Sequence, residues 1–226
     1  MFAVAFAAFI LGPALLAAPF RPYPLLRAGD ILDLLTPLVL IPLYWLLFRA
    51  GGEGAPGRAE TVAFIALAAL WVEGQAMHLA ANAIGHRSAE FAGTSAAALV
   101  HFMDETLSHY LWHAGIVGLS WLLLQRAWRD TWVDRRAGTG PATAAGLLYG
   151  FTYFAAFVEA GTASLGLPFA ALAVGWIAVR GRRRRLGRQP LVTFLFAAHA
   201  FALLSFLGWA LYWRGLPEFS AVGIID

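Results

Sequence analysis

The sequence contains neither cysteine nor lysine. The absence of cysteine excludes disulfides, thiolate metal sites and cysteine nucleophiles. All sixteen basic residues are arginine, so a retinal Schiff base and other lysine-dependent nucleophilic chemistry are excluded as well. Charged residues are scarce, at 13% of the chain. Polar stretches are no longer than loops, and we therefore predict a single transmembrane domain over residues 1–226.

Hydrophobic residues make up 60% of the chain, and the mean hydropathy is +0.68. Such a composition is typical of integral membrane proteins. Several apolar segments approach the ~20 residues that are needed to cross the hydrocarbon core. We predict from them an all-α bundle of seven transmembrane helices. The predicted helices cover 2–19, 31–49, 61–85, 95–124, 142–161, 164–180 and 191–213. The first lacks a basic leading region, so we interpret it as a retained helix.

Arginine is distributed unevenly between the predicted loops. Most of it falls at 49–60, 126–141 and 180–190, after the second, fourth and sixth helices. The positive-inside rule places these loops and the N-terminus in the cytoplasm, with the C-terminus outside and the protein in the inner membrane. We interpret the arginine run at 182–185 as a topology determinant beside anionic lipid. Membrane lipids are therefore the expected partners, no nucleic acid is expected, and the oligomeric state is left open.

One predicted helix carries an unusual number of ionisable side chains. The stretch HFMDETLSHYLWH, residues 101–113, contains three histidines and two carboxylates. Glu105, His109 and His113 are spaced by four residues and so share one face of a helix. A charged side chain at the bilayer centre costs roughly 2.5–3.5 kcal/mol on insertion scales, so such groups persist where they pair, line a wet cavity or bind a ligand. This ladder therefore indicates metal or proton chemistry.

The helix before it carries a second ladder of polar residues. His78, Asn82 and His86 share one face, with Glu73 about one turn earlier. A short loop makes the two helices antiparallel neighbours, so their polar faces can oppose each other. Imidazoles four residues apart can bind one ion from a single face. The sequence thus predicts a metal centre. The candidate ligands are His78, His109, His113, Glu73 and His199 of the last helix; Asp104 or Glu105 is the candidate general base, and Asn82 the candidate oxyanion donor.

Imidazole and carboxylate ligands without sulfur favour a divalent metal such as zinc, with iron possible. A catalytic zinc keeps three protein ligands and an open position for water. The ladders lie towards the outer half of the predicted bundle, where a substrate enters from the lipid. We therefore expect a metal-dependent hydrolase of a lipid ester or amide. The sequence leaves open whether His86, His101 and Glu159 belong to the site, and a packing role for His199 is also open.

Two short motifs carry a resemblance to a known family. Glu73 and His78 in EGQAMH, together with Asp104 and Glu105 in MDETLSH, resemble the superfamily of alkaline ceramidases and progestin/adiponectin-type receptors. The resemblance implies seven helices and an intramembrane zinc hydrolase. The sequence departs from that superfamily at two points. Its last helix offers only His199 in place of a histidine pair, and Gly74 stands where a serine is expected.

Three other functions use the same residues. A di-iron oxidase or desaturase would draw on the histidines with Glu73, Glu105 and Glu159, although such enzymes usually present their histidines at the cytoplasmic side. A b-type haem protein would place His78 opposite His109. A proton-coupled or divalent-ion transporter would use the ladders as a relay.

Overall fold

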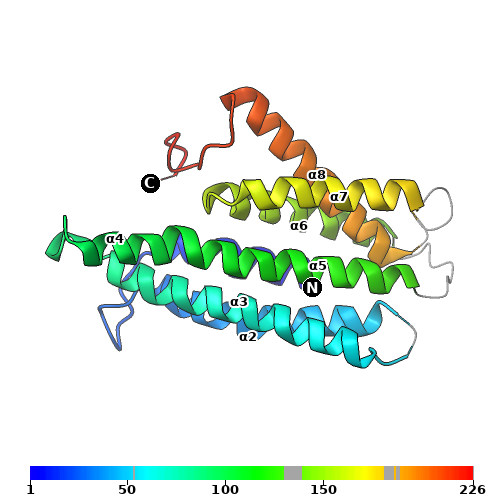
Figure 1. Ribbon diagram of the computed structural model, residues 1–226, viewed down its shortest axis with the longest axis horizontal. Helices are drawn as coiled ribbons and strands as arrows, with labels where there is room; N and C mark the ends of the chain where they lie inside the picture. Colours follow the sequence, from blue (N-terminus) through cyan, green and yellow to red (C-terminus); the bar gives the residue numbers. More distant parts are fainter. Residues whose placement is uncertain (53, 130–138, 181–185, 187–188, 226) are drawn as a thin grey trace.

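The computed structural model describes residues 1–226 except 53, 130–138, 181–185, 187–188 and 226, and the described part is all-helical. Most helices lie side by side along the long axis of an elongated bundle, and the last helix crosses the others obliquely (Figure 1). The long helices are α2 (Ala28–Ala50), α3 (Arg58–Gly85), α5 (His109–Arg129), α6 (Thr139–Glu159), α7 (Ala163–Arg180) and α8 (Pro190–Trp213). The short ones are α1 (Phe2–Leu11), η1 (Pro13–Leu15), η2 (Ser88–Glu90), α4 (Ser95–Phe102) and η3 (Met103–Ser108).

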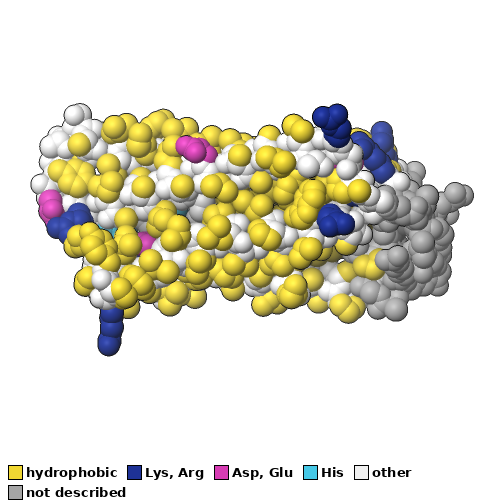
Figure 2. Space-filling model, turned by 90° about the horizontal axis from the view of Figure 1, so that it is seen from below, with side chains coloured by type: hydrophobic (Ala, Val, Ile, Leu, Met, Phe, Trp, Pro, Cys, Tyr) yellow, Lys and Arg dark blue, Asp and Glu magenta, His cyan; other side chains and the backbone are white. Residues whose placement is uncertain are grey.

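Five helices in the described part of the chain, α2, α3, α6, α7 and α8, are each long and apolar enough to cross a membrane. Figure 2 shows hydrophobic side chains over the middle of one face of the bundle, with most charged side chains towards its two ends. Exposed apolar surface of this extent is unfavourable in water but not in lipid. The chain is therefore a multi-pass membrane protein. The arginine run at 182–185 lies outside the described residues.

The first apolar segment forms a shorter helix than we predicted. Instead of continuing over 2–19, α1 ends at Leu11, and Pro13, which lacks a backbone N–H, begins the turn η1. The ten residues of α1 rise about 15 Å, roughly half the thickness of the hydrocarbon core. The N-terminus accordingly lies part way along the bundle (Figure 1). The prediction of a full-length helix over 2–19 is wrong.

The helix predicted over 95–124 is a composite of three elements. The α-helices α4 and α5 are joined without a break by η3, a π-helical segment with the sequence MDETLS. Within it the Ser108 hydroxyl donates to the backbone carbonyl of Asp104. A π segment holds an extra residue in the turn, and such segments are frequent at functional sites. The acidic part of the first ladder thus sits in the widened turn.

Glycines allow α3 and α5 to pack closely. A Cβ atom added at Gly74 of α3 would lie 2.4 Å from the backbone nitrogen of Trp112, and one at Gly115 of α5 would lie 2.9 Å from the carbonyl oxygen of Leu67. No side chain fits at either distance. Small residues at a helix interface let two backbones approach in this way in membranes. The close approach sets the polar face of α3 directly against η3 and α5.

A buried arginine joins the C-terminal end of α5 to the end of α2 and the start of α3. The Arg126 guanidinium donates to the carbonyl oxygens of Phe48 (2.7 Å) and Gly54 (2.6 Å) and to Glu60 Oε2 (3.0 Å). The exposed Arg129 contacts the other oxygen of Glu60 at 2.9 Å. These bonds satisfy backbone carbonyls near the C-terminus of α2, where helix carbonyls lack intrahelical partners.

Candidate functional site

His78 of α3 lies between two aspartates from two other elements. Its Nδ1 atom is 2.8 Å from Oδ1 of Asp104 in η3, and its Nε2 atom is 3.7 Å from Oδ2 of Asp33 in α2. Both carboxylate side chains are only 10% exposed. The shorter contact is of ion-pair length, whereas the longer one exceeds a hydrogen bond. We call these three residues the Asp33–His78–Asp104 cluster.

Asp33 is held in place by a short chain of side chains. Gln75 Nε2 donates to Asp33 Oδ1 at 3.1 Å, and Trp71 Nε1 donates to Gln75 Oε1 at 3.3 Å. Gln75 and Trp71 are both buried. Because one oxygen of Asp33 is occupied in this way, the other faces His78. Sequence reasoning missed Asp33, although a carboxylate inside the predicted helix 31–49 was a signal that could have found it.

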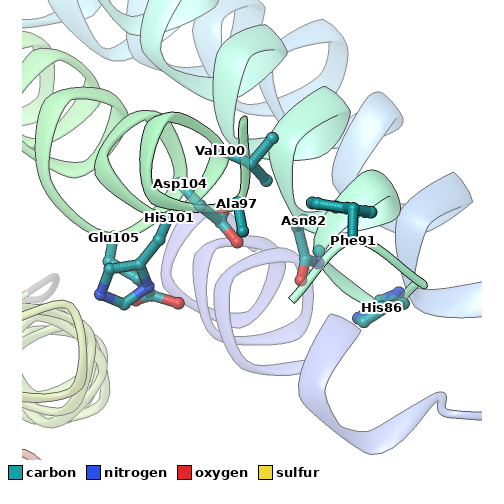
Figure 3. A pocket seen from close by; sticks show the side chains of 9 residues that line it. Asn82, His86, Phe91, Ala97, Val100, His101, Asp104 and Glu105 are labelled. Carbon is teal, nitrogen blue, oxygen red and sulfur yellow. The ribbon is translucent and has the colours of Figure 1, made fainter. Parts of the chain in front are cut away.

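A pocket of about 270 Å³ opens beside the cluster, between the end of α3 and the α4–η3 segment. Figure 3 shows Asp104 between the α3 side of the pocket, with Asn82, and the α4 side, with His101 and Glu105. A methyl group added at Gly85 would lie 3.7 Å from Asp104 Oδ2. Asp104 thus turns Oδ1 to His78 and Oδ2 towards Gly85, a lining residue. The α3–η3 pocket is lined by Asn82, Gly85, His86, Phe91, Ala97, Val100, His101, Asp104 and Glu105.

The histidine ladder of α5 continues inward from the cluster. The ring of His109 lies 4.9 Å from that of His78 and 6.2 Å from that of His113. His109 Nδ1 is 3.1 Å from the carbonyl oxygen of Glu105. The polar faces of the two helices therefore oppose each other at His78 and His109, as we expected from the sequence.

His113 ends the ladder in an apolar environment. Its ring packs against Trp112 at 3.8 Å and Phe157 at 4.0 Å. Its Nδ1 atom is 2.5 Å from the hydroxyl of Thr162. Nε2 is buried and has no hydrogen-bond partner among the described residues. Thr162 therefore orients a ring whose other nitrogen is left free.

Two candidate ligands lie apart from the cluster. The Glu73 side chain is exposed on α3. His199 of α8 is buried, with Nδ1 2.8 Å from the carbonyl oxygen of Leu195 and its ring 5.7 Å from Tyr153. Tyr153 in turn stacks on Phe157 at 4.1 Å, so two aromatic rings stand between His199 and His113. These positions do not bring Glu73 or His199 to the cluster.

The polar residues whose role the sequence left open divide into two groups. His86 and His101 line the α3–η3 pocket. Glu159 instead holds the segment after α8, because its Oε2 accepts the backbone N–H groups of Phe219 at 2.9 Å and Ser220 at 3.2 Å. Beside it, burial and the negative charge of Glu159 raise the pKa of Glu218 above its ordinary value.

The arrangement does not assemble the expected three-ligand metal site. The two carboxylates approach different nitrogens of His78, so they do not converge on one point. Within the described ranges, no group of three or more histidine or acidic side chains is placed to hold an ion. A catalytic zinc requires three such ligands. As placed, the described residues do not fit that centre.

No protein-family model, curated protein or solved structure matches the chain. The resemblance to the intramembrane zinc hydrolases therefore remains a prediction from two short motifs. At Gly74, where that superfamily has serine, the backbone of Trp112 leaves no room for a side chain.

Proposed function

We propose that the chain is an integral membrane hydrolase that acts on the ester or amide bond of a lipid, with Asp104 as its general base. The observation that supports this is the position of Asp104, which is 7% exposed, lines the α3–η3 pocket and contacts His78 at 2.8 Å. A carboxylate that faces a polar pocket and is supported from behind by an imidazole is suited to proton transfer.

Polar side chains that line the pocket, and others that stand behind it, have roles in this proposal. Asp104 takes a proton from a water molecule through Oδ2, while His78, which lies between Asp104 and Asp33, positions the carboxylate from behind. The amide of Asn82 donates to the oxyanion that develops on the substrate carbonyl. The proton that Asp104 takes from the water molecule then passes to the leaving group. The roles follow from which residues line the pocket and which stand behind them.

Metal dependence, with zinc favoured and iron possible, stays a separate prediction. Elemental analysis of the purified protein tests it, with His78→Ala, His109→Ala and His113→Ala as variants. Stoichiometric metal that all three variants retain would contradict a histidine-bound ion. Seven membrane crossings, a cytoplasmic N-terminus, an extracytoplasmic C-terminus and residence in the inner membrane also belong to the proposal. Accessibility labelling of cysteines introduced at each loop tests them, because the chain has no cysteine of its own.

A proton- or ion-coupled transporter is the second candidate, and the ladder from His78 through His109 to His113 favours it. Ring separations of 4.9 and 6.2 Å suit a relay. The inner end of the ladder is dry, since His113 is enclosed by Trp112 and Phe157. Proton flux into liposomes that contain the protein would support transport. A Soret band or an iron absorption spectrum would indicate the haem or di-iron alternatives instead.

The test of the hydrolase is turnover of a panel of lipid esters and amides in mixed micelles. We expect Asp104→Asn to lower turnover roughly 10²–10⁴-fold, the usual contribution of a general base. Glu73→Gln removes the same charge from the exposed face of α3 and should leave turnover unchanged. Equal turnover by wild type and Asp104→Asn would refute the proposed base.

A further inference from the structure

The α3–η3 pocket has an unusual balance of charge. Asp104 and Glu105 both line it, and neither arginine nor lysine is among its lining residues. In Figure 3, Asp104 and Glu105 extend from the same segment as His101, opposite Asn82. An anionic head group placed there would meet two carboxylates with no fixed positive charge to offset them. The lining therefore disfavours phosphate and favours a group that donates hydrogen bonds.

The histidine at the end of α3 does not reverse this balance. Burial, together with the positive charge of Arg27, lowers the pKa of His86 below its ordinary value. The imidazole of His86 therefore binds a proton less readily than a free histidine does. Among the residues that line the pocket, His86 therefore adds little positive charge to offset the two carboxylates.

Asp104 is also short of hydrogen bonds for so buried a group. It is 7% exposed, and its Oδ1 atom has no well-aligned hydrogen bond among the described residues, although His78 Nδ1 lies 2.8 Å away. Oδ2 is turned towards Gly85 in the pocket. Of the two carboxylate oxygens, Oδ2 is therefore the one that a ligand in the pocket can approach.

We propose that the α3–η3 pocket binds the ammonium head group of an amine-bearing lipid, with Asp104 and Glu105 accepting its hydrogen bonds. This deepens the proposed function, on which it rests, by naming the head group of the substrate. A pocket of about 270 Å³ holds a head group and not acyl chains. Phe91 and Val100 supply apolar contacts for the first methylene groups.

Three single-chain probes of equal length test the proposal: dodecylammonium, dodecanol and dodecyl phosphate. Each is titrated into the purified full chain in neutral micelles, and Kd is measured for each. We expect dodecylammonium to bind at least about tenfold more tightly than the other two, a difference of about 1.4 kcal/mol. Glu105→Gln should remove most of that preference while leaving dodecanol binding unchanged.

Glu73→Gln is the matched control, because it removes the same charge from α3 outside the pocket. It should leave all three Kd values unchanged. Equal binding of the three probes, or an equal loss of ammonium binding in Glu73→Gln, would overturn the proposal. The binding assay does not depend on turnover, so ammonium binding without hydrolysis would refute only the proposed function. Hydrolysis of lipids without any ammonium preference would refute only this inference.

Discussion

Replacement of Gly74 by alanine tests whether α3 and α5 are as close as the structure places them. The added Cβ would lie 2.4 Å from the Trp112 nitrogen, 2.7 Å from the Ser108 carbonyl oxygen and 2.9 Å from Leu111 Cβ. Two of these neighbours are backbone atoms, which cannot turn aside as the end of a side chain can. The helices must therefore move apart, and overpacking of this kind costs about 1–3 kcal/mol.

The expected change in thermal stability follows from that cost. For a chain of this size, 1 kcal/mol corresponds to roughly 2–4 °C in Tm, so Gly74→Ala should lower Tm by roughly 2–12 °C. Tryptophan fluorescence in detergent, at one fixed scan rate, measures Tm, since membrane proteins often unfold irreversibly. Gly74→Ser, which introduces the residue that the superfamily resemblance expects, should be at least as destabilising.

Gly175→Ala in α7 is the matched control. A Cβ added there meets nothing within 4 Å. Alanine is favoured over glycine within a helix by roughly 0.5–1 kcal/mol, so Tm should stay constant or rise slightly. A Gly74→Ala protein that unfolds at the same temperature as wild type would refute the close packing, and with it the approach of His78 to η3.

Two further predictions concern the ends of the bundle. Arg126→Met should destabilise the protein by roughly 1.5–3 kcal/mol in chemical denaturation, because the charged hydrogen bonds of Arg126 are buried. Arg129→Met, at a side chain that is 65% exposed, should cost about 0–1 kcal/mol. Equal losses of stability in the two variants would contradict this difference between a buried and an exposed arginine. The raised pKa of Glu218 means that the folded state binds the proton of Glu218 more tightly than the unfolded state does. The contact of Glu159 with Phe219 should therefore strengthen as pH falls through that raised pKa and weaken as pH rises above it. Hydrogen exchange of the Phe219 amide, corrected for intrinsic rates, measures this, and an unchanged pH dependence in Glu218→Gln would argue against it.

The class of the fold could be predicted because it depends on composition. Long apolar runs must be helical in lipid, since each backbone polar group needs a partner within its own segment. The helices α2, α3, α6, α7 and α8 accordingly fall close to the predicted ranges. The length of α1 could not be read in the same way, because hydropathy continues past Leu11 while the backbone turns at Pro13. Hydropathy therefore overestimates the length of a helix that ends at a backbone turn within an apolar segment.

The site could be predicted only in part, for a related reason. Helical spacing placed His78 and His109 on facing surfaces, and their rings do lie 4.9 Å apart. Spacing says nothing about a third helix, so Asp33 of α2 could not be assigned to the same cluster. It also assumes 3.6 residues per turn throughout, which η3 does not obey. Residues before and after η3 therefore deviate from the expected shared face.

The widened turn of η3 sets the rotation of α4 relative to α5 within their composite helix. An α-helix advances about 100° per residue, so one residue more or less between Met103 and Ser108 would rotate His101 against His113 by that angle. A deletion confined to this turn would leave α5 packed against α3 and would move the α4 side of the pocket. Insertion or deletion of one residue in this turn would therefore change where the pocket-lining residues lie relative to His109 and His113.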